Sequence, residues 1–194
     1  MVLGIIGGIG AGKSLVVNLL QGMTCAYVID VDQLGHALLL KDSTVYNTLV
    51  KTFGQDILDS QNNISRPKLG NIVFSDKDKL LQLNSITHPA IFKTVESLLD
   101  NPHRYTIIDA ALLIEIGLIN LVDKVIGVYA DEAIRIDRIM KRNGFSYLEA
   151  KKRINNQKTW EDLEKVIDIV VNNNGDINNT KCQLLEIIEV LHET

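Results

Sequence analysis

The sequence predicts an α/β protein built on a five-stranded parallel sheet, and three observations support this prediction. Short apolar runs alternate with stretches of helical periodicity along most of the chain, a pattern typical of parallel sheets covered by helices. The first apolar run leads directly into a glycine-rich segment. The length of 194 residues is that of one domain with room for an inserted subdomain.

Five apolar runs are the candidate strands. Each is short, and an unbroken apolar run of this length is expected where both faces of a strand are buried. The runs lie at 2–6, 26–29, 105–108, 125–129 and 169–171. Because helical patterns separate them, we expect the strands to pair in parallel through helical crossovers.

The interval between the second and third runs is unusually long and mostly helical in pattern. Gly54 is a plausible stop for one of these helices. The expected helices cover 33–40, 44–53, 67–74, 77–86 and 89–99. We therefore expect a helical insertion, at about 31–103, in a sheet core formed by about 1–30, 104–134 and 159–194.

Two further helical regions follow the fourth strand. The stretch 131–157 predicts a pair of helices that break at Asn143-Gly144, and the stretch 181–191 carries its apolar residues on one helical face. The pair includes a segment, 135–158, with eight basic and two acidic residues in a chain of net charge −4. Solvated helix faces usually mix charge signs, so this imbalance favours a lid that closes over phosphates.

Composition excludes several classes of protein. Apolar residues make up 46% of the chain and charged residues 23%, as in globular proteins and unlike disordered or fibrous ones. The sequence has no apolar run of transmembrane length and no basic leader before its first strand. Cys25 and Cys182 have no metal-binding spacing. We expect a reduced, cytoplasmic protein with no membrane partner and, given its acidic balance, no nucleic acid partner.

Residues 7–14, GGIGAGKS, match the phosphate-loop pattern G-x-x-x-x-G-K-[ST] in full. Glycines let backbone N–H groups turn inward around nucleotide phosphates. Lys13 can reach the β- and γ-phosphates, and the hydroxyl of Ser14 can bind Mg²⁺. A strand precedes the motif and an apolar-periodic helix follows it. The sequence therefore predicts the three-layer P-loop NTPase or kinase fold and a nucleotide site.

Aspartates end the second and third strands. Ligands of open parallel sheets bind at the carboxyl ends of the strands, so Asp30, Asp32 and Asp109 are expected near the site. We expect one of the first two to cap the next helix and the other to act chemically. His36 follows Asp32 by four residues, on the same helix face. Asp109 stands where a metal-binding carboxylate would be.

These residues resemble the dephospho-coenzyme A kinase family over nearly the whole chain. Residues 7–14 resemble its G-G-I-G-S-G-K-S, and 28–32, VIDVD, resemble V-I-D-A-D, whose second aspartate is taken as the base. Residues 112–115, LLIE, resemble P-L-L-x-E, and 170–175, VVNNNG, resemble V-I-D-N-N-G near the adenine. Further matches are Arg66 with Leu69 and Phe74, His88-Pro89 with Ile91, the lid arginines Arg138 and Arg142, and Gln157 after the lid.

The resemblance implies an ATP-dependent transfer of phosphate to the ribose 3′-hydroxyl of dephospho-coenzyme A, with Mg²⁺, in a monomer or weak homo-oligomer. It assigns catalysis to Asp32, Lys13 and Arg138. Nucleotide binding falls to Gly8, Ile9, Gly10, Ala11, Gly12, Lys13, Ser14, Leu15, Arg138, Arg142, Asn173, Asn174 and Gly175. Acceptor binding falls to Asp32, His36, Arg66, His88, Leu113 and Glu115, and Mg²⁺ to Ser14 and Asp109.

The chain also departs from the family pattern at several positions. Ala111 replaces a proline, Leu15 a threonine and Asn172 an aspartate, while Trp160 and Leu163 stand where some members carry arginines. Two other functions stay open on the residues. A nucleoside or nucleotide kinase would share the core and lid. A regulatory NTP switch would share the phosphate loop, although the chain lacks the guanine-binding N-K-x-D of GTPases.

Overall fold

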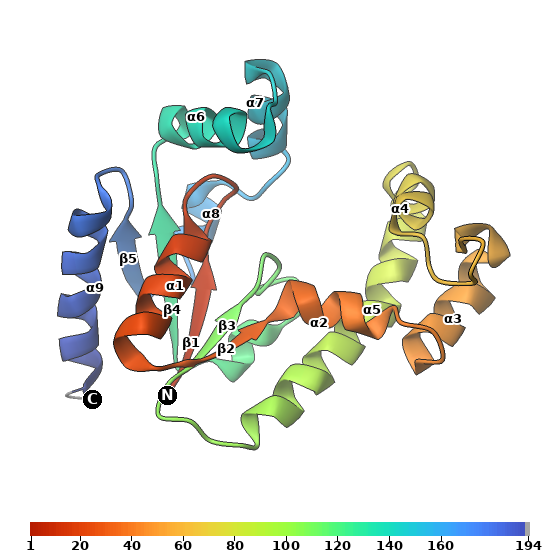
Figure 1. Ribbon diagram of the computed structural model, residues 1–194, viewed down its shortest axis with the longest axis horizontal. Coiled ribbons are helices and arrows are strands. Elements are labelled where there is room, and N and C mark those ends of the chain that lie inside the picture. The colour runs from red at the N-terminus through yellow and green to blue at the C-terminus, as the bar shows by residue number, and fades with distance from the viewer. Residues whose placement is uncertain (193–194) are drawn as a thin grey trace. The chain divides into compact units, whose positions relative to one another are not determined.

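The computed structural model describes residues 1–192 and contains the predicted five-stranded sheet (Figure 1). The strands are β1 (Val2–Ile6), β2 (Tyr27–Asp30), β3 (Thr106–Asp109), β4 (Lys124–Tyr129) and β5 (Ile169–Asn172). Their order is β2-β3-β1-β4-β5, with β1 paired in parallel to β3 and β4, and β4 to β5. Because β1 is the central strand, the loop that follows it emerges in the middle of the carboxyl edge of the sheet.

Nine α-helices accompany the strands in the described part of the chain. They are α1 (Lys13–Thr24), α2 (Val31–Leu38), α3 (Thr44–Phe53), α4 (Arg66–Phe74), α5 (Lys77–Leu99), α6 (Glu132–Asn143), α7 (Tyr147–Asn155), α8 (Trp160–Glu164) and α9 (Ile177–His192). Short 3-10 turns cover Gln55–Ile57 and Leu118–Leu121. None of the helices within residues 1–192 has the length and apolarity needed to cross a bilayer.

The prediction of two helices at 77–86 and 89–99 was wrong, because α5 runs through Pro89 without a break. Proline lacks the N–H that would bond the carbonyl four residues earlier, which normally favours a helix end. Here both halves pack on the same apolar cluster, through Leu80, Leu83 and Ile86 before the proline and Ala90 after it. Shared packing offsets the lost hydrogen bond.

The chain divides into two compact units. The first contains the sheet, with 1–29, 102–113 and the chain from Ile119 onward. Its core joins side chains of β1, α1 and α9, including Ile5, Leu20 and Leu184, each at most 2% exposed. This packing holds the carboxyl end of β1 and the first turn of α1 in a fixed relation.

The second unit is helical and contains Asp30–Asn101 together with Ile114–Leu118. It has its own core, built from Val45, Leu49, Ile57, Leu69 and Val73. The expected insertion falls almost entirely within this unit. The segment 114–118, which sequence analysis grouped with the sheet, clusters with the helical unit instead.

Helices α6 and α7, in the region predicted to form a lid, belong to the sheet unit and form a small cluster of their own. Ile136 and Ile139 of α6 pack on Ala150 and Ile154 of α7, and Ile9 of the phosphate loop packs against them. Gly144 ends α6 with a φ of 68°, a left-handed conformation that glycine adopts at little cost. The predicted break at Asn143-Gly144 is therefore confirmed.

Candidate active site

The loop between β1 and α1 has the backbone that a phosphate loop needs. Gly10 and Gly12 have φ values of 80° and 98°, which L side chains rarely adopt. A Cβ on Gly10 would come within 2.7 Å of the backbone oxygen of Arg135, and one on Gly12 would collide with the amide of Asn173. α1 begins at Lys13, so its positive dipole end is directed at the loop. Gly12 therefore serves both the turn and the close approach of Asn173.

Lys13 and Asp109 form an ion pair at the carboxyl ends of β1 and β3. Their side chains are 18% and 16% exposed, so the pair is largely shielded from water. The adjacent Ser14 is exposed. This places a cation, a carboxylate and a hydroxyl beside the loop, as sequence analysis expected for a site that holds phosphates and Mg²⁺.

These residues suit Mg²⁺ in a particular way. Mg²⁺ is usually held by one or two carboxylates together with substrate phosphates, and not by an all-protein cage. Among residues 1–192 there is no cluster of three or more His, Cys, Asp and Glu side chains that would form such a cage. Asp109 and the hydroxyl of Ser14 could supply the protein oxygen ligands of a site in which substrate phosphates provide the others.

In the helical unit, Asp30 caps α2, as predicted for one of the two aspartates. Its carboxylate accepts hydrogen bonds at 2.9 Å from the backbone N–H and from the side-chain amide of Gln33. Asp32 lies in the first turn of α2 with an exposed side chain, and His36 is exposed one turn later. Capping therefore occupies Asp30 and leaves Asp32 as the accessible carboxylate.

The remaining predicted acceptor residues differ in accessibility. Arg66 at the start of α4 is exposed, and His88 within α5 is half-buried. Glu115 is exposed in the 114–118 segment of the same unit. Leu113 belongs to the sheet unit, is 1% exposed and packs over Gly4 of β1. Its side chain thus fills the core, and only its backbone could meet a ligand.

Arg138 on α6 already contacts the phosphate loop. Its Nη1 donates to the carbonyl oxygens of Ala11 at 3.2 Å and Gly10 at 3.4 Å, and its Nη2 donates to the Asn173 carbonyl at 2.8 Å. Arg142, at the end of the same helix, is exposed and donates to Asn143 Oδ1 at 3.0 Å. The structure brings Arg138 to the loop and leaves Arg142 away from it.

Asn173 and Asn174 in the loop after β5 have structural partners. Asn173 is 2% exposed, and its Nδ2 donates to the Ala11 carbonyl at 2.7 Å. Its Oδ1 accepts from the hydroxyl of Thr180, which is fully buried in α9, at 2.9 Å. Asn174 Oδ1 accepts from the backbone N–H of Asp131 at 2.8 Å. Both side-chain amides therefore form hydrogen bonds within the protein that hold neighbouring backbone segments in place.

Three further residues contact this network, and sequence analysis assigned none of these particular contacts. Gln157 Oε1 accepts from the Ile9 N–H at 2.7 Å, Arg135 Nε donates to the Ile9 carbonyl at 2.9 Å, and Thr180 holds Asn173. Gln157 was recognised only as a family match. Arg135 belongs to the basic segment 135–158 that sequence analysis expected to close over phosphates. Nothing local in the sequence marks Thr180.

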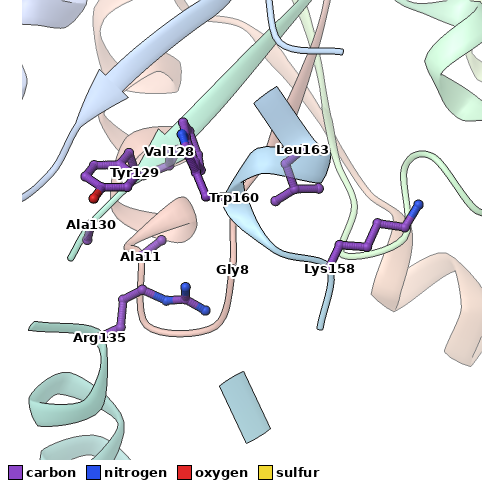
Figure 2. Close-up of a pocket in the computed structure, with 9 residues that line it drawn as sticks. All are labelled: Gly8, Ala11, Val128, Tyr129, Ala130, Arg135, Lys158, Trp160 and Leu163. Carbon is purple, nitrogen blue, oxygen red and sulfur yellow. The ribbon is translucent and has the colours of Figure 1, made fainter. Parts of the chain in front are cut away.

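Tyr129 and Trp160 form an aromatic pair beside the loop, with ring centroids 4.8 Å apart and planes at 65°. They line a small pocket with Gly8, Ala11, Val128, Ala130, Arg135, Lys158 and Leu163 (Figure 2). A hydrogen bond to Asp131, together with the negative charge of that residue, raises the pKa of the Tyr129 phenol. Burial lowers the pKa of the Arg135 guanidinium, which stays protonated at neutral pH.

Comparisons with known proteins agree with this arrangement. A dephospho-CoA kinase of Aquifex aeolicus is 40% identical over 191 residues, 97% of this chain and 96% of the relative. The structure is similar to the crystal structure of TT1252 from Thermus thermophilus, with TM-score 0.83 and 27% identity over 98% of this chain and 96% of that one. It also matches the fold of a Campylobacter jejuni dephospho-CoA kinase, with TM-score 0.72 and 24% identity over 98% and 96%.

A family model provides the most direct assignment. The model described as dephospho-CoA kinase matches residues 1–179, which include the phosphate loop, the helical unit, the lid and the loop after β5. The resemblance noted from the motifs is thereby confirmed, and the chain belongs to the dephospho-CoA kinase family.

Proposed function

We propose that this chain transfers the γ-phosphoryl group of ATP to the ribose 3′-hydroxyl of dephospho-coenzyme A, the final step of coenzyme A biosynthesis. Family membership over residues 1–179 supports this function. The observation that carries it is the phosphate loop with Lys13 ion-paired to Asp109 at its base, because a loop of this kind holds the phosphates of a nucleoside triphosphate donor.

The phosphoryl group moves in line from ADP to the acceptor oxygen. The 3′-oxygen forms the new bond to phosphorus, the bond to the bridging oxygen of ADP breaks, and the hydroxyl proton leaves to a base. Lys13 and Arg138 neutralise charge that spreads over the transferred group. The backbone N–H groups of the loop and the first turn of α1 hold the phosphates for this step.

Asp32 is the base in this proposal. It is exposed at the start of α2, directly after the carboxyl end of β2, while Asp30 is occupied by capping. A carboxylate in this place can orient the 3′-hydroxyl and accept its proton. His36, Arg66, His88 and Glu115 of the helical unit would bind the rest of the acceptor.

Ser14 and Asp109 would hold Mg²⁺ through the hydroxyl and the carboxylate. The bound ion would neutralise negative charge on the phosphate oxygens. Binding it requires Asp109 to share its charge between the ion and Lys13, its present partner.

The acceptor is identified by a coupled assay of ADP release with ATP, Mg²⁺ and one candidate acceptor at a time. Dephospho-coenzyme A should support turnover far above the rate with adenosine, nucleoside monophosphates or no acceptor. Preference for a nucleoside monophosphate would instead indicate a nucleotide kinase. Equal ADP release with and without any acceptor would indicate an NTP switch.

The role of Asp32 is tested by single-turnover transfer at saturating ATP and Mg²⁺. Asp32→Asn keeps the size of the side chain and removes its charge, so transfer should slow by roughly 10²–10⁴-fold, the usual worth of a general base. Calorimetry should still detect dephospho-coenzyme A binding. Asp30→Asn is the matched control and should cost less in rate. A large loss confined to Asp30→Asn would reverse the two roles.

A further inference from the structure

The pocket beside the phosphate loop contains a charged group that the function described so far does not use. Its walls come from β4, α8, the phosphate loop and Arg135 of α6. Figure 2 shows the Arg135 guanidinium extending toward the loop between Ala11 and Gly8, whereas the ammonium of Lys158 points away. Arg135 is therefore the cation that faces the inside of this pocket.

The Arg135 guanidinium is held at one nitrogen and unsatisfied at another. Its Nε donates to the Ile9 carbonyl at 2.9 Å, which fixes the plane of the group against the loop. Its Nη2 is buried and has no hydrogen-bond partner within residues 1–192. A Cβ on Gly8 would collide with this guanidinium, so any larger residue there would displace the guanidinium from its present position. A buried, unpaired donor on a cation is costly, and an acceptor is expected to meet it.

The nearby acceptors on the protein are already engaged or absent. None of the described residues that line the pocket has a carboxylate. Glu132 on the first turn of α6 has its Oε1 3.5 Å from Lys151 Nζ. Asp131 is bonded to the Tyr129 phenol. The missing acceptor is therefore an anionic oxygen from outside the chain, and the adjoining loop is one that binds phosphates.

Arg135, Arg138 and Arg142 of α6 differ in their hydrogen-bond partners. Arg138 donates to three backbone carbonyls, and Arg142 donates to Asn143 Oδ1. Arg135 alone among these three combines contact with the loop and a buried nitrogen without a partner.

We propose that Arg135 binds the phosphate chain of ATP, with Nη2 donating to a phosphate oxygen while Nε keeps its bond to the Ile9 carbonyl. This inference rests on the proposed kinase function and adds a phosphate-binding residue to its site. Two substrates of the reaction carry phosphate chains. The contacts of Arg135 with Gly8 and Ile9 favour ATP over the pyrophosphate of dephospho-coenzyme A.

Arg135→Gln is the sharpest test, because glutamine Nε2 occupies the same place along the side chain as arginine Nε. The variant retains a donor for the Ile9 carbonyl and loses both the charge and Nη2. Hydrogen bonds to charged groups typically contribute about 10- to 100-fold to a binding constant. We expect ATP affinity, measured by calorimetry, to fall by about that factor, with dephospho-coenzyme A affinity unchanged and the unfolding temperature not lowered, because the variant also removes a costly unpaired donor.

Two further variants complete the experiment. Arg135→Lys keeps the charge without the planar fork and should recover only part of the affinity. Lys152→Gln removes an exposed lysine of the neighbouring α7 and controls for the loss of one positive charge on the lid. It should leave ATP binding as in the unaltered protein.

The outcomes separate the possibilities. If the unaltered enzyme uses dephospho-coenzyme A and Arg135→Gln binds ATP as tightly as the unaltered enzyme does, the proposal for Arg135 is overturned. A loss of dephospho-coenzyme A affinity with ATP affinity intact would also overturn it, since Arg135 would then serve the acceptor. An equal loss of ATP affinity in Lys152→Gln would also overturn the proposal, because the effect would then come from the net charge of this region and not from a contact of Arg135. Inactivity of the unaltered protein toward dephospho-coenzyme A would overturn the proposed function instead.

Discussion

Asn173 shows how one buried amide fixes the shape of a nucleotide loop. The Ala11 carbonyl can only accept, so the group facing it must be Nδ2, at 2.7 Å. The other end of the amide is then Oδ1, which requires a donor, and Thr180 provides one at 2.9 Å. The orientation of Asn173 is therefore determined at both ends, by a loop carbonyl and by a hydroxyl on α9.

Thr180→Val should weaken this arrangement without changing the size of the side chain. It leaves Oδ1 of Asn173 buried and unsatisfied, which costs about 1–3 kcal/mol. We expect a lower free energy of unfolding by denaturant and a higher KM for ATP, since the Ala11 carbonyl loses a firmly oriented partner. Thr180→Ser keeps the hydroxyl, so its free energy of unfolding and its KM for ATP should stay close to those of the unaltered protein. Equal behaviour of the two variants would show that the hydroxyl contributes nothing.

At the scale of elements, α6 is attached to the phosphate loop from two sides. Arg135 and Arg138 donate to carbonyls of the loop, and the side chain of Ile9 packs into the α6–α7 cluster. After α7, Gln157 accepts the Ile9 N–H. The lid helices and the loop are therefore joined through both polar and apolar contacts, and a change on the lid should alter chemistry at the loop.

Arg138 tests this connection. Arg138→Ala removes two hydrogen bonds to loop carbonyls and the charge that we propose to act on the transferred phosphoryl group. We expect kcat to fall more than ATP affinity, because charge stabilisation counts most in the transition state. Arg138→Lys should rescue only partly, as an ammonium cannot reach three carbonyls with a planar fork. Steady-state kinetics with ATP titrations measure both quantities. A change confined to the ATP dissociation constant would make Arg138 a binding residue only.

The start of α7 provides a prediction about pH. Hydrogen bonds from the Ser146 hydroxyl, and then from its backbone N–H, lower the pKa of Glu149 in a capping box. A carboxyl with a lowered folded-state pKa stabilises the fold above its unfolded pKa, and this contribution disappears as pH falls through the folded-state value. Glu149→Gln should therefore lower the protection of α7 amides from hydrogen exchange at pH 7, and this effect should shrink as the pH falls and the carboxylate becomes protonated.

A matched control for that experiment is Glu189→Gln on the exposed face of α9. It removes the same charge away from any helix start and should leave α7 protection unchanged over the same pH range. A Glu149→Gln effect that did not shrink at all as the pH fell would mean that the ionised carboxylate does not support the helix.

Local sequence patterns were enough to predict the helices and strands, but they could not predict the hydrogen bonds between residues far apart in the sequence. The strands, the phosphate loop and the break at Gly144 follow from residues close together in the sequence. The bonds from Asn173 to Ala11 and from Gln157 to Ile9 join residues 162 and 148 positions apart, and hydrophobic periodicity contains no information on such pairs. The error at Pro89 has a similar origin, because tertiary packing overrode a local helix-breaking signal.

At the scale of the whole molecule, the chain builds two cores for the two halves of its reaction. The phosphate loop, Lys13 and Asp109 belong to the sheet unit, while Asp32 and His36 belong to the helical unit. Each unit buries its own apolar cluster. The residues that we propose for the donor and for the acceptor therefore depend on separate packing, and each ligand should stabilise the protein through its own unit.

ATP with Mg²⁺ should raise the unfolding temperature on its own. At a concentration of 100 times its dissociation constant a ligand adds about 2.7 kcal/mol, and in a domain of this size each kcal/mol shifts the midpoint by roughly 2–4 °C. Thermal scans should thus show a rise of about 5–10 °C. Lys13→Ala at the same ATP concentration should show a much smaller rise. An ATP effect equal in both proteins would mean that the nucleotide binds away from the loop.

The long sequence separations around the phosphate loop also matter during synthesis on the ribosome. The loop is among the first parts of the chain to be made, yet Ala11 meets Asn173 only after 162 further residues have been added. At about 5–20 residues per second, that interval lasts on the order of 10–30 s. Throughout it the glycine-rich loop lacks Gln157, Asn173 and Thr180, so a nascent chain cannot hold ATP in the finished geometry. The ability to bind nucleotide should appear late and abruptly, as the strand β5 and the helix α9 leave the exit tunnel.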